Sequence, residues 1–140
     1  MSNKLDQMYL DIANRIGQQS YAVRFKVGAL LVKDNNILSF GYNGTPHGRD
    51  NTCEFNVGGT LLTKKEVLHA ESNAIAKVAK STQSSEGATL YLSLSPCLEC
   101  AKLIVQSGIK RVVFETKYRD EKPIKFLEEC GITVEQMRKQ

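Results

Sequence analysis

Apolar positions near the start of the chain recur at intervals of three and four residues. This spacing, within residues 4–18, predicts an amphipathic helix that ends near Gly17. Two apolar runs follow at residues 27–32 and 37–40, and both have the composition of β-strands. The intervening residues 33–36 supply Asp and Asn, which favour a hairpin turn between these strands.

The pattern breaks after the second predicted strand. Residues 41–48 read GYNGTPHG, and these glycines and the proline predict an irregular loop that continues to about Gly59. Apolar positions then recur at helical intervals. We expect a second helix that begins between Thr63 and His69 and runs to about Lys80.

The second half of the chain alternates between strand and helix patterns. The expected elements are a strand at 89–94, a helix with Pro96 in its first turn and a stop at Gly108, a strand at 111–115, a helix at 122–130 and a short strand at 132–134. This order predicts an α/β fold with helices packed on a sheet. The length of 140 residues fits a single domain, residues 1–140.

Composition adds few constraints. Apolar residues make up 41% of the chain, charged residues 24%, and no apolar run is long enough to span a bilayer. The first ten residues contain Lys4 and Asp6 and lack the pattern of a secretory signal, so we expect a cytoplasmic protein with no membrane partner. The net charge of +4 is mild and the basic residues are dispersed, so no nucleic-acid partner is expected.

Two of the four cysteines have the spacing of a metal site. In a reducing compartment, Cys97 and Cys100 are better explained by metal binding than by a disulfide. On a helical turn their sulfurs project from one face, and His69 can add a nitrogen from the neighbouring helix. Two thiolates and one imidazole leave a fourth tetrahedral position open, which is typical of catalytic zinc. We therefore predict one catalytic Zn²⁺ per chain.

Glu71 follows His69 by two residues, and we interpret it as a general acid/base rather than a metal ligand. An H-x-E motif followed by P-C-x-x-C is the signature of zinc-dependent deaminases. Taken alone, the cysteine pair could also be a redox pair or half of a structural site.

Four segments carry a resemblance to a known family: VGA at 27–29, GYNGTP at 41–46, HAESNA at 69–74 and LSLSPCLECAK at 92–102. The chain resembles the deoxycytidylate deaminases of the cytidine deaminase-like superfamily. The resemblance implies a three-layer α/β/α sandwich with a mixed five-stranded sheet. It also implies hydrolysis of dCMP to dUMP and ammonia, which feeds thymidylate synthesis. A homohexamer, activated by dCTP and inhibited by dTTP with Mg²⁺, is implied as well.

A nucleotide substrate needs a partner for its phosphate. Arg24 and Lys26 precede the first strand, and the turn at residues 43–45 can present backbone N–H groups to an anion. The two cations could also be ordinary solvated charges. By resemblance, further contacts to the sugar, phosphate or base come from Asn43, Thr45, Ala70 and Ser95. Tyr118 could close the pocket.

The resemblance also suggests an effector site in the loop after the second strand. Its candidate residues are Gly41, Tyr42, Asn43, Gly44, Arg49, Asp50 and Glu54. Some family members bind a second, structural zinc in a longer insert before the H-x-E motif. Here only Cys53, Cys130 and His47 remain as soft ligands, and we interpret both cysteines as small buried hydrophobic residues.

Two other functions stay open. Another deaminase of the superfamily could act on a free nucleoside or on an adenosine in tRNA, although RNA recognition favours clustered basic and aromatic residues and this chain has no Trp. A noncatalytic module could use zinc only to hold its helices together. Such a site needs a fourth ligand, and Glu71 is the only nearby candidate.

Overall fold

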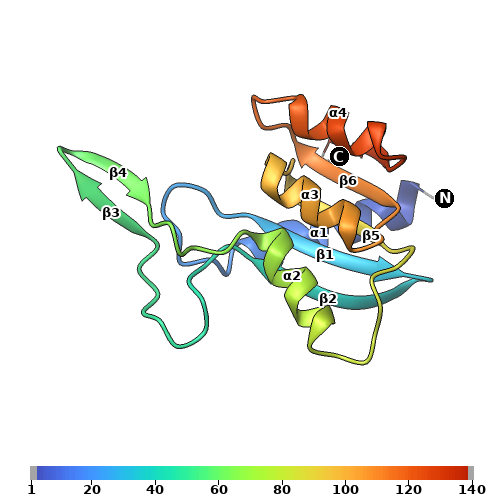
Figure 1. Cartoon of the computed structure of the whole chain (residues 1–140), viewed down its shortest axis with the longest axis horizontal. Helices are drawn as coiled ribbons and strands as arrows, with labels where there is room; N and C mark the ends of the chain where they lie inside the picture. The colour runs from blue at the N-terminus through green and yellow to red at the C-terminus, as the bar shows by residue number, and fades with distance from the viewer. Residues whose placement is uncertain (1–2, 139–140) are drawn as a thin grey trace.

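A computed structural model of the chain describes residues 3–138. Its elements, in chain order, are α1 Asn3–Gly17, β1 Gly28–Lys33, β2 Asn36–Tyr42, β3 Glu54–Val57, β4 Thr60–Thr63, α2 Ala70–Ala79, β5 Thr89–Leu94, α3 Leu98–Gln106, β6 Arg111–Thr116, α4 Lys122–Glu129 and β7 Thr133–Gln136 (Figure 1). No helix in the described part of the chain is long and apolar enough to cross a bilayer.

The main sheet has five strands in the order β2-β1-β5-β6-β7. Strand β1 is antiparallel to β2 and β5, whereas β6 is parallel to β5 and β7. This confirms the predicted mixed sheet. Because β1 runs against its neighbours, the residues before β1 lie at the same sheet edge as those after β2, β5 and β6. Four separate parts of the chain therefore meet at one edge.

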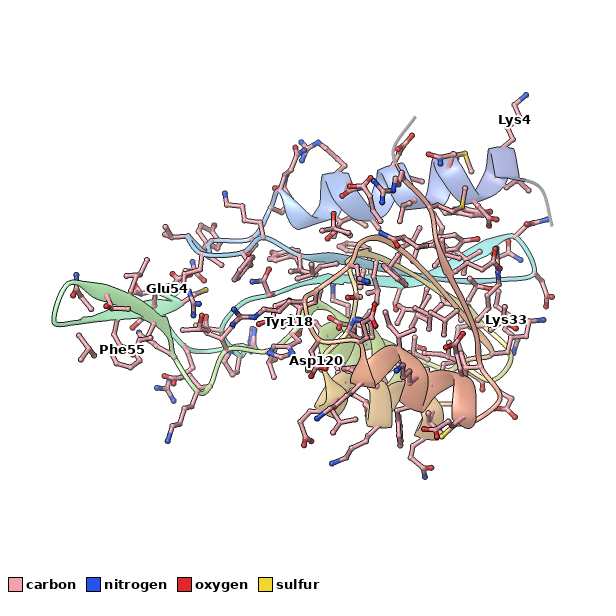
Figure 2. All side chains as sticks on the ribbon, turned by 90° about the horizontal axis from the view of Figure 1, so that it is seen from above. Lys4, Lys33, Glu54, Phe55, Tyr118 and Asp120 are labelled. Carbon is pink, nitrogen blue, oxygen red and sulfur yellow. The ribbon has the colours of Figure 1, made fainter. Side chains whose placement is uncertain are left out.

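The sheet is covered on both faces, which confirms the three-layer sandwich. Helix α1 lies on one side and α2, α3 and α4 lie on the other (Figure 2). Side chains of β1 alternate accordingly: Leu30 and Val32 pack in the α1 layer, and Ala29 and Leu31 pack in the opposite layer. Fully burying a leucine stabilises the fold by about 1.5–3 kcal/mol.

The turn between β1 and β2 follows the prediction. Asp34 and Asn35 have φ angles of 51° and 61°, which lie in the left-handed region. Asn and Asp tolerate this region better than other side chains, and two such residues fit the two-residue turn of a twisted hairpin.

The predicted loop up to Gly59 is wrong in its second half. Strands β3 and β4 form an antiparallel hairpin that projects away from the rest of the molecule (Figure 1). Gly58 and Gly59 form its turn with φ angles of 57° and 87°. A Gly-Gly pair between two short β-type runs is itself a hairpin signal, so the sequence contained the information that the loop interpretation missed.

Other element boundaries shift by a few residues. Helix α2 begins at Ala70, one residue after the predicted range of Thr63 to His69, because His69 is its N-cap residue and has an extended backbone. Pro96 precedes the N-cap residue of α3 instead of lying in its first turn. The last strand, β7, is Thr133–Gln136 rather than 132–134.

Candidate active site

The three predicted metal ligands come together at the shared sheet edge. His69 and Cys97 are the N-cap residues of α2 and α3, and Cys100 lies in the first turn of α3. His69 Nδ1 is 3.2 Å from Cys100 Sγ and 3.4 Å from Cys97 Sγ. The three ligand atoms all lie within 4.8 Å of one another. A tetrahedral zinc with bonds of about 2.0–2.3 Å holds its ligands at about this separation, so the residues fit the ion.

The two cysteines differ in their affinity for a proton. The hydrogen bond from the Cys100 thiol lowers the pKa of Cys97 to about 4. The same bond, together with burial, raises the pKa of Cys100. Both residues lie at a helix N-terminus, where unpaired N–H groups and the helix dipole favour a thiolate. One imidazole and two sulfurs of this kind are a donor set that zinc prefers.

Glu71 is buried beside this cluster, in the first turn of α2, with 4% of its surface exposed. Burial raises the pKa of the carboxyl group, and the nearby His69 opposes this. Its carboxyl contacts the Cys100 thiol, yet it is not part of the group of convergent ligands formed by His69, Cys97 and Cys100.

A cavity of about 250 Å³ opens in front of these residues. Its wall includes His69, Cys97 and Glu71. Most of the rest comes from the segment before β1, the ends of β2, β5 and β6, and the hairpin. Five of the predicted substrate residues lie in this wall: Arg24, Asn43, Ala70, Ser95 and Tyr118. The other two do not line this cavity. Lys26 is exposed to solvent, and Thr45 lines a different cavity.

Comparison with known proteins decides the family. Residues 3–116 match the model described as the cytidine and deoxycytidylate deaminase zinc-binding region. The chain belongs to this deaminase family. The deoxycytidylate deaminase of Enterobacteria phage T4 is 36% identical, over 81% of this chain and 79% of the relative. The deoxycytidylate deaminase of Homo sapiens is 39% identical, over 81% of this chain and 66% of the relative.

A solved structure supports the same family. The dCMP deaminase of cyanophage S-TIM5, crystallised in complex with dCMP and dUMP, superposes with a TM-score of 0.92. It is 41% identical and the match covers 98% of this chain and 99% of that chain. The fold and the zinc-binding region of the deaminase family are therefore both present in this chain.

Within this deaminase domain, several predicted substrate side chains also hold the protein together. The Asn43 side chain accepts a hydrogen bond from the Val27 N–H (2.9 Å) and donates one to the Phe25 carbonyl (2.7 Å). The Ser95 hydroxyl accepts a hydrogen bond from the Tyr118 N–H at 2.6 Å, so Ser95 fixes the position of Tyr118 in the cavity wall. Spacing in the sequence gave no signal for these roles.

The residues predicted for the effector site are spread over different surroundings. Tyr42 and Gly44 line a second cavity of about 240 Å³, which Thr45 also lines. Gly41 packs so closely on α2 that a Cβ atom there would lie 2.5 Å from the Ala70 carbonyl oxygen. Arg49 pairs with Glu66, and Asp50 pairs with Lys64. The last two candidates, Asn43 and Glu54, line the active-site cavity.

The two cysteines outside this site, Cys53 and Cys130, differ in their exposure to solvent. Cys53 is buried, as predicted, but Cys130 is exposed at the end of α4, so the prediction of a buried Cys130 is wrong. Within residues 3–138, the only group of three or more convergent metal-binding side chains is the one formed by His69, Cys97 and Cys100. Cys53, Cys130 and His47 are not gathered into a second group there.

Proposed function

We propose that the chain is a zinc-dependent deaminase that hydrolyses dCMP to dUMP and ammonia. The observation that carries the proposal is the convergence of His69, Cys97 and Cys100 beside a buried glutamate, at one side of a cavity that also contains an arginine. The relative crystallised with dCMP and dUMP supports the choice of substrate.

His69, Cys97 and Cys100 are the residues that would hold the zinc ion. A zinc ion held by these residues would supply Lewis-acid activation of water. The placement of two of these ligands at helix N-caps holds their backbone rigidly at the cavity edge.

Glu71 moves the protons of the reaction. Its carboxylate takes a proton from the attacking water and gives it to N3 of the cytosine ring. In the second half of the reaction the carboxylate takes the remaining water proton from the new hydroxyl group on C4 and delivers it to the leaving amino group. The water oxygen becomes the new C4 carbonyl oxygen and the amino group departs as ammonia, so atoms and charge balance. Burial of Glu71 keeps bulk water away from these transfers.

Arg24 is our candidate for recognition of the 5′-phosphate. Among the described residues that line the cavity, Arg24 is the only lysine or arginine. Its guanidinium donates a hydrogen bond to Thr63 Oγ1 at 3.3 Å and lies over the Phe25 ring, 5.7 Å from the ring centroid. Arginine provides several N–H donors in a planar group that matches a phosphate.

A substrate panel tests this function. Zinc-loaded protein is assayed for ammonia release with dCMP, deoxycytidine, a cytosine-containing RNA and an adenosine-containing tRNA anticodon stem. We expect kcat/KM for dCMP to exceed the value for deoxycytidine, and Arg24→Ala to remove most of that difference. Equal values for the two substrates would contradict phosphate recognition, and turnover of the tRNA substrate alone would favour the rival deaminase.

Regulation and assembly rest on the resemblance, and we keep them and the cytoplasmic location as proposals. We expect a cytoplasmic homohexamer that dCTP activates and dTTP inhibits in the presence of Mg²⁺. Adding each nucleotide to the dCMP assay tests the effectors, and sedimentation of the purified protein tests the assembly. A monomer with unchanged kinetics would contradict both.

A further inference from the structure

The segment between α1 and β1 builds much of the cavity wall without regular secondary structure. Residues 20–27 are all described, and none of them lies in a helix or strand. Four of them, Ala22, Arg24, Phe25 and Val27, line the active-site cavity. The backbone N–H and C=O groups of such a segment need partners, because an unpaired group costs free energy when it is buried.

Side chains from distant parts of the sequence supply those partners. Glu54 Oε2 accepts hydrogen bonds from the N–H groups of Val23 (2.8 Å) and Arg24 (3.1 Å). At the other end of the segment, the Asn43 amide holds Phe25 and Val27 through the two hydrogen bonds given above. A carboxylate that receives two consecutive backbone N–H groups forms charge-assisted bonds, which are stronger than neutral ones.

Glu54 is well placed to act as an anchor. It is the first residue of β3 and only 7% of its surface is exposed, whereas its neighbour Phe55 is 44% exposed. Figure 2 shows Glu54 at the base of the projecting hairpin. The hairpin is thereby tied through one carboxylate to the backbone of Arg24.

We propose that Glu54 is a positioning residue that fixes the backbone of Val23 and Arg24 and so sets the preference for a 5′-phosphorylated substrate. The inference rests on the proposed function, since it assigns Glu54 a role in placing the arginine that binds phosphate. Glu54 acts through Arg24 and not through the reacting ring. A displacement of about 1 Å in a group that positions substrate can cost about 100-fold in rate, so the anchor has a measurable effect.

The test compares Glu54→Ala and Glu54→Gln with dCMP and deoxycytidine as substrates. Glu54→Ala should raise KM for dCMP by ~10- to 100-fold and leave kcat close to that of the wild type. The value of kcat/KM for deoxycytidine should not change. Glu54→Gln keeps an oxygen that accepts both N–H groups, so it should recover most of the affinity for dCMP.

A double-mutant cycle with Arg24 separates this role from general destabilisation. Once Arg24→Ala has removed the phosphate contact, adding Glu54→Ala should have no further effect on dCMP turnover. Glu129→Ala is the matched control, because it removes an exposed carboxylate of α4 outside the cavity. It should behave like the wild type with both substrates.

Hydrogen exchange supplies a readout that needs no activity. The amides of Val23 and Arg24 should exchange faster in Glu54→Ala, with zinc content unchanged. If that variant does not fold, Glu54→Gln replaces it: its neutral oxygen accepts weaker hydrogen bonds, so the two amides should exchange slightly faster and KM for dCMP should rise slightly, with no such rise once Arg24 is alanine. Equal losses with both substrates, or additive losses with Arg24→Ala, would overturn the inference. A wild-type protein that leaves dCMP intact would overturn the proposed function instead.

Discussion

Two clusters of polar side chains, each with one buried carboxylate, lie on opposite faces of the sheet, and they are organised differently. The inner cluster, consisting of Asp6, Tyr91, Arg111 and Glu135, lies on the α1 side. Asp6 accepts hydrogen bonds from the Tyr91 hydroxyl at 2.7 Å and from the Arg111 guanidinium at 2.9 and 2.8 Å. Arg111 Nε donates to Glu135 at 2.8 Å. The donors and acceptors of this cluster therefore point at one another.

The edge cluster, consisting of His69, Glu71, Cys97 and Cys100, points instead toward a cavity. Three of its four residues line that cavity, and His69 and Cys97 are accessible from it. Buried polar groups that bond one another hold a fold together, whereas groups that converge on an open space can bind and transform a ligand. We therefore expect the inner cluster to stabilise the fold and the edge cluster to bind and transform the substrate.

The two buried carboxylates make the contrast sharper. Asp6 is 1% exposed and Glu71 is 4% exposed, so both are removed from solvent. Hydrogen bonding to Arg111 lowers the pKa of Asp6 despite its burial. Burial raises the pKa of Glu71. The two pKa values therefore shift in opposite directions, because the hydrogen bond to Arg111 is the larger effect at Asp6 and burial is the larger effect at Glu71.

The largest expected effect is on catalysis at the edge cluster. Glu71→Gln should lower kcat for dCMP by ~10²- to 10⁴-fold, because the variant can no longer take and deliver protons. Metal analysis and urea unfolding of the same preparation should show zinc retained and stability not reduced. Loss of the metal would instead make Glu71 a ligand and favour a structural zinc site.

The next effect is on stability at the inner cluster. Arg111→Met leaves the Asp6 carboxylate buried without its cation, which should lower the free energy of unfolding by about 3–5 kcal/mol. Replacing the pair together, as Asp6→Leu with Arg111→Met, should recover most of that loss. Urea unfolding measures both variants, and kcat of the folded protein should stay at the wild-type value. A change in kcat would contradict the claim that the inner cluster affects stability and not catalysis.

A smaller effect is expected for Tyr91→Phe, which removes one hydrogen bond to Asp6 and leaves the arginine in place. A hydrogen bond to a charged group contributes about 1.5–3 kcal/mol, so unfolding should become easier by an amount in this range. Thermal or urea unfolding of the variant beside the wild type gives the value. No loss of stability would indicate that the hydroxyl contributes nothing to the inner cluster.

The mildest test is the dependence of stability on pH. Because the folded pKa of Asp6 lies below its ordinary value of 3.8, its ionisation stabilises the folded state fully above that pH. The contribution should decrease as the pH falls below 3.8 and be lost at the lower, folded pKa. Unfolding of Asp6→Asn should depend less on pH in this range than unfolding of the wild type. Identical pH profiles would contradict the shift.

Motifs in the sequence were sufficient to predict which side chains meet in the edge cluster. His69 and Glu71 are two residues apart and Cys97 and Cys100 are three apart, so one turn of chain already places each pair. Periodicity also predicted the five strands of the main sheet and the helices between them in their order along the chain. The β3–β4 hairpin was missed, although the Gly58-Gly59 pair marked it.

Contacts between distant residues could not be predicted in this way. Asp6 and Arg111 are 105 residues apart, and Glu54 lies 31 and 30 residues from the two N–H groups that it holds. Neither pair leaves a periodic or spaced signature in the sequence, because each depends on how the layers pack. The anchoring of the cavity wall by Glu54 and Asn43 therefore became visible only in the folded chain.

Zinc removal and reconstitution of the wild-type protein tests the central claim most directly. Ammonia release from dCMP is measured on one preparation as isolated, after chelation and after zinc is added back, with the metal content determined each time. We predict one zinc per chain, loss of activity in proportion to the metal removed, and its return with zinc. Turnover of dCMP that persists in metal-free protein, or zinc-loaded folded protein that leaves dCMP unchanged, would contradict the account.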